Sequence, residues 1–385
     1  MKVISWQPVL TDHQSYTLEA FQQASDCTLT IYVLKAENKA RSLQGWVNRH
    51  ADSLSPQIIP QKGWFFYVVK QLWDNRNAVH VFASPFEKLP LIITLLIAVA
   101  MGSRVFLISE PYSPISTGYQ NNNRRFINGV KAILRPALYY VYGALLGRRI
   151  SGVFAISSLA VSQYRRMGIN KEKIFPFGYF VPRSSMDCMD RQVKESKNGY
   201  LRLIFIGTLI DRKGLDVLIK SITSLNANGI DITLDVFGSG EVDQFEFNQS
   251  TINYCGLIPF GTAQDVIAGY DVLVLPSRND GWGVVVNEAL MAGVPVICSN
   301  RVGAGAIIDK WQCGDVFISE DSLDLERVLN KLIITSDTLE NMRIAAHNVN
   351  TILAPEVAGR YMYDIISDEP IGVTKKAPSC PWYEV

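Results

Sequence analysis

Two carboxylates, Asp280 and Glu288, stand eight positions apart in a stretch whose residue types could bind a polar ligand. The β-branched run Val272–Leu275 is typical of a strand buried on both faces of a parallel sheet, and Pro276 with Ser277 ends it. A helix follows and contains Glu288. Because a helix rises about 1.5 Å per residue, we expect the two carboxylates to lie roughly 12 Å apart. That separation matches the length of a nucleotide sugar.

Two glycines, Gly281 and Gly283, lie between the acids. Glycine lets the backbone approach a ligand closely, and the first amide hydrogens of a helix have no partner within the helix. Such a helix start binds anions, phosphate above all. The sequence therefore predicts a phosphate site at the beginning of this helix, with one carboxylate on either side.

This arrangement resembles the acidic motif of glycosyltransferase family 4. The shared pattern is a carboxylate, a glycine-containing triplet, an apolar run and a glutamate eight positions after the first acid, followed by Ala289, Gly293 and Pro295. The family usually has glutamate at the first position, where Asp280 of this chain is one methylene shorter. The resemblance is strongest over 201–300 and concerns only the architecture before residue 152.

The resemblance implies a role for each residue of the motif. Glu288 would hold the ribose hydroxyls of a nucleotide sugar, and the amides of Gly283 and Val284 would hold its diphosphate. Asp280 would contact the donor hexose. Gly281 would belong to the same donor-binding loop.

A second loop, GTLIDRKG, begins at Gly207 after an apolar strand and contains Arg212 and Lys213. It resembles the basic loop of the same family, in which an arginine and a lysine neutralise the donor diphosphate. A pair of solvated loop charges is the alternative. Because these cations and a helix start can stabilise the leaving diphosphate, we expect neither a metal ion nor a cofactor.

Five expected strands of the second half end in small residues, namely Gly207, Gly238, Gly256, Ser277 and Ser299. Ligands of parallel sheets bind beyond the carboxyl ends of the strands. A single glycine pair would be a weak signal. Five small residues at one edge predict that the glycines among them face the donor.

The first half predicts a similar sheet. Expected strands at 3–6, 29–33, 80–83 and 104–109 alternate with helices such as 89–101, which is typical of a parallel, doubly wound sheet. With the family resemblance, this pattern implies an α/β protein of the GT-B architecture, in which two Rossmann-like domains face a cleft and close on the donor.

The composition also suggests where the chain divides, because 184–199 is polar and charged like a linker. We expect, in order, an acceptor-side domain at 1–183, the linker at 184–199, a donor-binding domain at 200–352, a helix at 353–370 that returns to the first domain, and a poorly ordered or loosely docked tail at 371–385.

Three residues of the first half could carry chemistry. His13 lies in a polar loop, where it either caps a helix beginning near Tyr16 or contacts substrate. Glu110 follows the strand VFLIS, near a position where many family members have histidine. It either lies in the active cleft or caps the loop before Pro111. His80 begins its strand and is better interpreted as a core or surface residue.

The segment from Pro111 to Lys171 holds nine lysines and arginines and no acidic residue. Within it, 124–149 predicts an amphipathic helix that Pro136 should kink or split. Arg124, Arg125, Lys131 and Arg135 lie beside its apolar residues. Such a helix is typical of an anionic membrane surface, where each basic side chain contributes about 1 kcal/mol. Alternatively, its apolar stripe packs on the sheet and its arginines are solvated or bind an anionic acceptor.

Composition bounds the function classes. The 385 residues, 48% of them hydrophobic, suffice for two cores, and a net charge of +1 gives no reason to expect nucleic acid as a partner. The six cysteines form no CxxC pair, so we expect neither disulfides nor a metal site. The N-terminus lacks a signal-peptide pattern, and the apolar run 89–101 is too short to span a bilayer.

Together these features predict a retaining glycosyltransferase that moves a hexose from a nucleotide diphosphate sugar to a hydroxyl of a glycan or lipid-linked acceptor in cell-surface polysaccharide synthesis. We expect it in the cytoplasm, peripheral on the inner face of the plasma membrane. The alternatives are a non-catalytic scaffold of a polysaccharide assembly complex, or an epimerase or phosphorylase that uses the same architecture. A dinucleotide-dependent dehydrogenase is disfavoured, because no GxGxxG opens a βα unit.

Overall fold

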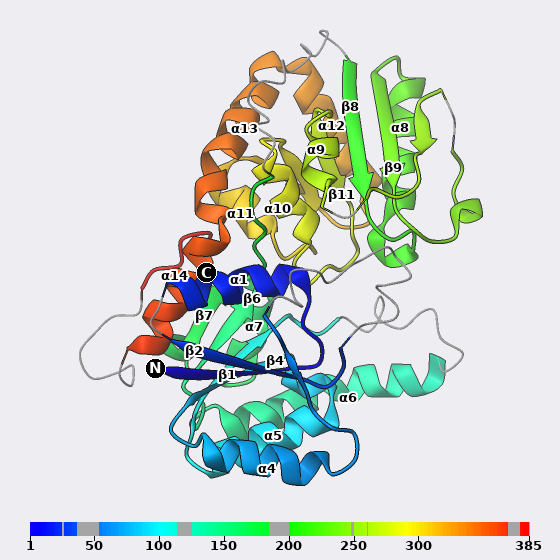
Figure 1. Ribbon diagram of the computed structural model, residues 1–385. Helices are drawn as coiled ribbons and strands as arrows, with labels where there is room; N and C mark the ends of the chain where they lie inside the picture. The colour runs from blue at the N-terminus through cyan, green and yellow to red at the C-terminus, as the bar shows by residue number, and fades with distance from the viewer. Residues whose placement is uncertain are drawn as a thin grey trace. The chain divides into compact units, whose positions relative to one another are not determined.

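The computed structural model describes residues 1–24, 27–36, 54–113, 125–184, 200–247, 250–259, 261–368 and 378–384. The side chains of residues 87, 125–128, 131, 132 and 336 also lie outside this description. The chain divides into two compact units (Figure 1). The first unit comprises 1–112, 122–180 and 355–385, and the second comprises 113–121 and 181–354.

The first unit is built on a parallel sheet with the strand order β3-β2-β1-β4-β5-β6-β7. Its strands are β1 (Lys2–Gln7), β2 (Thr28–Val33), β3 (Gln57–Ile58), β4 (Val79–Ala83), β5 (Arg104–Ser109), β6 (Gly152–Ile156) and β7 (Ile174–Phe177). Both faces of the sheet are covered, which is why β4 is buried along its whole length and β1 everywhere except Lys2. The parallel sheet predicted from the alternation of strands and helices is confirmed.

Helices cover the two faces of this sheet (Figure 1). One layer consists of α4 (Trp64–Asp74), α5 (Leu89–Ala100), α6 (Arg125–Leu146) and α7 (Ser158–Arg166), with the short helix η1 (Pro85–Glu87) before α5. On the other face, α1 (Asp12–Gln23) packs against α14 (Pro355–Ser367). A Cβ atom at Gly359 would lie 2.4 Å from the backbone nitrogen of Phe21, so only glycine allows the two helices to approach this closely.

Several expectations for the first unit were wrong. The sequence pattern missed α4 and β3, and α1 begins at Asp12 instead of near Tyr16. Thr11 is the residue before this helix, and its backbone N–H donates to the side chain of Gln14 at 3.2 Å. His13 therefore lies inside the first turn and does not cap the helix. Helix α6 runs through Pro136 as one helix, so the expected split does not occur.

The C-terminal segment 378–384 is not loosely docked. Trp382 and Tyr383 are buried in the first unit, and the Trp382 ring lies 4.4 Å from the ring of Phe180. The Tyr383 hydroxyl donates to the carbonyl oxygen of Phe177 at 2.7 Å and accepts from the backbone nitrogen of the same residue. Two large aromatic side chains bury enough apolar surface to fix a short segment that has no secondary structure.

The second unit contains a parallel sheet with the order β10-β9-β8-β11-β12-β13. Its strands are β8 (Tyr200–Ile206), β9 (Asp231–Phe237), β10 (Ile252–Tyr254), β11 (Val272–Leu275), β12 (Val296–Ser299) and β13 (Gly314–Phe317). Its helices are α8 (Leu215–Ala227), α9 (Ala263–Ile267), α10 (Val284–Met291), α11 (Gly305–Trp311), α12 (Ser322–Ile334) and α13 (Ser336–Val349). The sequence pattern missed β13 and α11.

Candidate functional site

The loops that follow β8 and β11 meet in backbone contact. The loop after β8 ends in the short helix η4 (Asp211–Lys213) and Gly214, whose φ is 68°. A Cβ atom at Gly214 would lie 2.1 Å from the carbonyl oxygen of Pro276, so no side chain fits there. The backbone nitrogen of Arg278 donates to the carbonyl oxygen of Arg212 at 2.8 Å. The basic loop is thereby held beside the acidic motif.

This contact brings Lys213 and Asp280 together. Lys213 Nζ donates to Asp280 Oδ2 at 2.6 Å, and each side chain is only 14% exposed. Arg212 donates from Nη1 to the carbonyl oxygen of Asn279 at 2.7 Å. Burial alone would raise the pKa of the Asp280 carboxyl, but the charge and hydrogen bond of Lys213, with Arg212 nearby, outweigh it and lower the pKa. Asp280 is therefore an ionised carboxylate beside two cations at neutral pH.

Arg278 links these loops to two further segments. Its guanidinium donates to both carboxylate oxygens of Asp216 on α8, at 2.6 and 2.8 Å, and to Glu320 Oε1 at 3.0 Å. Burial raises the pKa of Asp216, but the Arg278 contacts outweigh this effect and lower it. Sequence reasoning missed this network, because its partners lie 62 and 42 positions away and share no spacing signal.

The loop between Asp280 and α10 is fixed from inside. Trp282 is buried, and its Nε1 donates to Asn287 Oδ1 at 2.8 Å. Gly283 has a φ of 88°, and a Cβ atom there would lie 2.9 Å from Leu275 Cδ2. Glycine is therefore required for both the backbone conformation and the close packing. Sequence reasoning recognised this glycine but not the anchoring role of Trp282.

Helix α10 begins at Val284, directly after this glycine, so its first amide groups point out of the helix start where an anion can bind. Glu288 lies one turn further along and is partly exposed at the residue level. Desolvation of its carboxyl raises the pKa of Glu288 to about 7. Among the described residues, none donates a hydrogen bond to this carboxylate, which leaves it available to hydroxyl donors.

The small residues that end the strands share one edge of the sheet, as the sequence predicted. Gly238 has a φ of 151°, and a Cβ atom there would lie 1.8 Å from the carbonyl oxygen of Gly207. The backbone nitrogen of Gly238 donates to the carbonyl oxygen of Gly256 at 2.8 Å. At the neighbouring strands, the Ser299 hydroxyl donates to the carbonyl oxygen of Ser277. The backbones of the three glycines thus lie against one another at the carboxyl ends of β8, β9 and β10.

The candidates of the first unit lie in different surroundings. His13 is 6% exposed, its Nε2 lies 3.1 Å from the Thr11 hydroxyl, and its ring meets the ring of Tyr179 edge-on at 4.7 Å. Glu110 follows the carboxyl end of β5 and is partly exposed. His80 is fully buried, accepts a hydrogen bond at Nδ1 from Trp6 Nε1, and has a pKa lowered to about 4 by burial. The interpretation of His80 as a core residue is confirmed.

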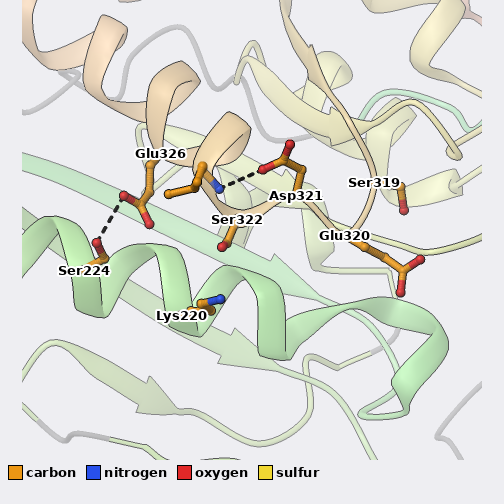
Figure 2. Close-up of a pocket in the computed structure, with 8 residues that line it drawn as sticks. Lys220, Ser224, Ser319, Glu320, Asp321, Ser322 and Glu326 are labelled. Carbon is orange, nitrogen blue, oxygen red and sulfur yellow. Dashed lines mark hydrogen bonds between the residues drawn. The ribbon is translucent and has the colours of Figure 1, made fainter.

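A separate hollow of about 550 Å³ lies in the second unit, between α8 and the start of α12 (Figure 2). It is lined by Lys220, Ser224, Ser319, Glu320, Asp321, Ser322, Leu323 and Glu326. Two of its polar groups have partners there: the Ser224 hydroxyl donates to Glu326 at 3.1 Å, and Asp321 accepts from the first amides of α12. One lysine against three carboxylates does not suit a diphosphate. The hollow contains no predicted site residue.

Comparison with known proteins bears on the same half of the chain. Residues 189–349 match the family model described as glycosyl transferases group 1. This span contains both loops, the three glycines and α10. The match therefore covers every donor-side residue that the sequence predicted and none of the first unit.

Two curated relatives illustrate the similarity. The chain is 26% identical over 215 residues to the putative colanic acid biosynthesis glycosyltransferase WcaL of Salmonella typhimurium, which covers 51% of each chain. It is 27% identical over 202 residues to the lipopolysaccharide glucosyltransferase WaaG of Escherichia coli K12, which covers 48% of this chain and 54% of WaaG. The matched part spans about two fifths to one half of the length of the curated relatives.

Among solved structures, HepE of Anabaena in complex with UDP has a TM-score of 0.65 and covers 94% of this chain and 98% of its own. The identity is 13%, so this likeness concerns the fold. It confirms the α/β class with two Rossmann-like parallel-sheet domains of the GT-B type.

Proposed function

We propose that this protein is a retaining glycosyltransferase that transfers a hexose from a nucleoside diphosphate sugar to a hydroxyl of a glycan or lipid-linked acceptor during cell-surface polysaccharide synthesis. The observation that carries the proposal is the pairing of Lys213 with Asp280 beside the start of α10. The match to the glycosyl transferase family model over the same residues supports it.

The roles follow from the chemistry at each position. Arg212 and Lys213 neutralise the diphosphate, where negative charge develops as the bond to the sugar breaks. The amides of Gly283 and Val284 hold the same diphosphate at the start of α10. Glu288 accepts hydrogen bonds from the ribose hydroxyls, and Asp280 orients the hexose. These residues stabilise the leaving group without a metal ion.

The donor-binding part of the proposal uses 200–352, with Gly207, Gly238, Gly256 and Gly281 as the backbone that approaches the nucleotide sugar. We assign the acceptor to 1–183. In that range, Glu110 stands at the carboxyl end of a strand, where ligands of parallel sheets bind. It is our candidate for the residue that contacts the reacting hydroxyl of the acceptor. His13 is the candidate for a second substrate contact.

We further propose that α6 holds the protein on the anionic inner face of the plasma membrane. Supporting this, the apolar stripe expected within 124–149 is exposed: Ile133 by 65%, Val141 by 49% and Val130 by 41%. The side that packs on the core of the first unit instead carries Tyr139 and Tyr142. Among the described residues, no helix is long and apolar enough to cross a membrane.

The test is to screen nucleoside diphosphate sugars by thermal shift, because a bound donor stabilises the folded state by mass action. The donor that raises the midpoint of thermal unfolding is then incubated with and without lipid-linked glycan acceptors. The anomeric configuration of the product is determined by NMR. We expect transfer with retention. Binding without any turnover would favour the scaffold, and a changed sugar nucleotide without acceptor would favour the epimerase.

A further inference from the structure

Helix α4 exposes a row of aromatic side chains. Phe66 is 78% exposed, Trp73 63% and Phe65 43%, although the opposite side of the helix buries Val68 and Leu72 in the core. Phe66 and Trp73 are seven residues apart, which is two helical turns, so they lie on the same side. Single exposed apolar residues are common on protein surfaces, but large aromatics gathered on one short helix mark a contact surface.

The neighbouring helix α5 also exposes apolar side chains. Leu89 is 66% exposed and Leu96 is 41% exposed, again two turns apart on one side. The helix contains no charged residue, and its one polar side chain, Thr94, is buried and bonded to the backbone of Pro90. Helices α4 and α5 pack on each other in one layer (Figure 1). A helix that is apolar on its outward side as well is expected to be covered by something other than water.

Basic residues accompany this surface. Lys62, Lys70, Arg76 and Lys88 are exposed, and the whole stretch 61–101 contains only two acids, Asp74 and Glu87. Lys70 lies between Phe66 and Trp73 on the exposed side of α4, and the guanidinium of Arg76 lies 5.7 Å from the centre of the Trp73 ring. Exposed aromatics interleaved with lysine and arginine are typical of a surface that sits at the headgroup level of an anionic bilayer.

We propose that the α4–α5 face, defined by Phe65, Phe66, Trp73, Leu89 and Leu96, docks on an anionic lipid bilayer. This proposal rests on the proposed function, in which α6 binds the membrane, and it adds a second element whose apolar side chains insert into the bilayer. The apolar side of α5 offers no hydrogen-bonding side chain, which suits lipid acyl chains better than a protein partner. The positive rim selects anionic headgroups. Helix α6 lies in the same helical layer, so both elements belong to one side of the first unit (Figure 1).

The experiment compares the wild type with a Phe66→Ser/Trp73→Ser variant in cosedimentation with vesicles of phosphatidylcholine and phosphatidylglycerol. We expect the partition coefficient of the variant to fall about tenfold or more, because two inserted aromatic rings are lost. The matched control is Leu323→Ser on α12 of the second unit, where Leu323 is 73% exposed. It should pellet like the wild type. All three substituted side chains are exposed, so their thermal midpoints should be unchanged.

Two further readouts separate this proposal from its alternatives. Vesicles with brominated acyl chains should quench the fluorescence of the wild type more than that of Trp73→Phe, because Trp73 approaches the acyl region. High salt screens the attraction between basic side chains and anionic headgroups. Under this condition the wild type should still bind vesicles, and Phe66→Ser/Trp73→Ser should not. If this variant pelleted like the wild type, or if it instead dissociated a dimer seen by light scattering, the bilayer proposal would be overturned. Thermal stabilisation by the nucleoside diphosphate sugar found in the screen tests the donor site independently and should be equal in all variants.

Discussion

Lys213 Nζ lies 2.6 Å from Asp280 Oδ2, although the two residues are 67 positions apart. The pair joins the basic loop after β8 to the acidic motif after β11, the two segments that the sequence assigned to diphosphate and hexose. The ammonium is held by the Asp280 carboxylate, so a diphosphate that binds as we propose would share it. The pair therefore positions the lysine in advance and keeps the carboxylate ionised.

Replacing both Arg212 and Lys213 with alanine should lower kcat by about 100-fold or more, since two cations that meet the charge developing on the leaving diphosphate are removed. Steady-state kinetics with the donor identified by thermal shift measures this. Denaturant unfolding is the companion measurement, and we expect the free energy of unfolding to change far less. Normal turnover in the double variant would show that the leaving group is stabilised elsewhere.

Arg278→Gln should raise the KM for the donor and lower kcat/KM by about tenfold, because the loop that carries Arg212 and Lys213 loses its attachment to Asp216 and Glu320. The paired carboxylates are partly exposed, so the loss of stability should be about 1 kcal/mol. Arg327→Gln is the matched control, because Arg327 pairs with Asp324 on the surface of α12. Equal kinetic effects of the two substitutions would mean that Arg278 forms only a surface ion pair and does not position the basic loop.

Most residues of the candidate site could be predicted from the sequence, but the residues that hold its loops in place could not. The glycines and acids were found because they obey local rules of spacing and backbone conformation. Arg278 and Trp282 were missed because their partners are fixed only by the tertiary structure. Helix α4 lacks a sequence signal for its start, because Gly63 stands in the place where a capping Ser, Thr, Asp or Asn would mark it. Strand β3 has only two residues, and β13 begins with Gly314 and Asp315, residue types that are uncommon in strands.

Glu288 should make donor binding pH-dependent. Its carboxyl has a pKa of about 7 in the folded protein and an ordinary value of 4.5. Protonation removes the acceptor for the ribose hydroxyls, so affinity should rise as the pH increases through about 7. Calorimetry with a nucleoside diphosphate sugar measures this, since such a donor has no phosphate group that titrates near neutral pH. Glu288→Ala should weaken binding by about 1.5 to 3 kcal/mol.

The same carboxyl gives a stability effect of defined sign. Between pH 4.5 and about 7 the folded state binds more protons than the unfolded state, so the free energy of unfolding should decrease as the pH rises and then level off. Glu288→Gln is the control, because it keeps the shape and cannot titrate. If the glutamine variant retained the pH dependence of donor affinity, another group would be responsible.

Replacing Asp271 should lower the stability of the second unit without involving the proposed donor site. Its carboxylate is fully buried between Arg202, at 3.2 Å, and Arg343, at 2.7 Å, and also accepts from the backbone nitrogen of Arg202. Asp271→Asn should destabilise the fold by about 3 to 5 kcal/mol, because the arginines lose their buried partner. Chemical denaturation measures the loss, with Asp364→Asn on the exposed pair with Arg360 as control. A loss equal to that of the control would contradict the prediction.

The basic helix gives the last prediction, which rests on charge. Changing Arg124, Arg125, Lys131 and Arg135 to glutamate should abolish cosedimentation with anionic vesicles at low salt, because the attraction of four basic side chains becomes repulsion. Neutral vesicles should bind the wild type much less. Thermal stabilisation by the nucleoside diphosphate sugar found in the screen should persist, because the proposed donor-site residues belong to the second unit, which has its own core.

Each outcome of the charge reversal separates two interpretations of α6. If the charge-reversed variant still pelleted with anionic vesicles at low salt, α6 would not be the electrostatic anchor. The α4–α5 face would then explain the membrane binding. Loss of both vesicle binding and stabilisation by the nucleoside diphosphate sugar would indicate that the segment belongs to the fold or the substrate site. The exposed stripe of Ile133 and Val141 argues for the membrane, because a packed helix would bury those side chains and present its charges instead.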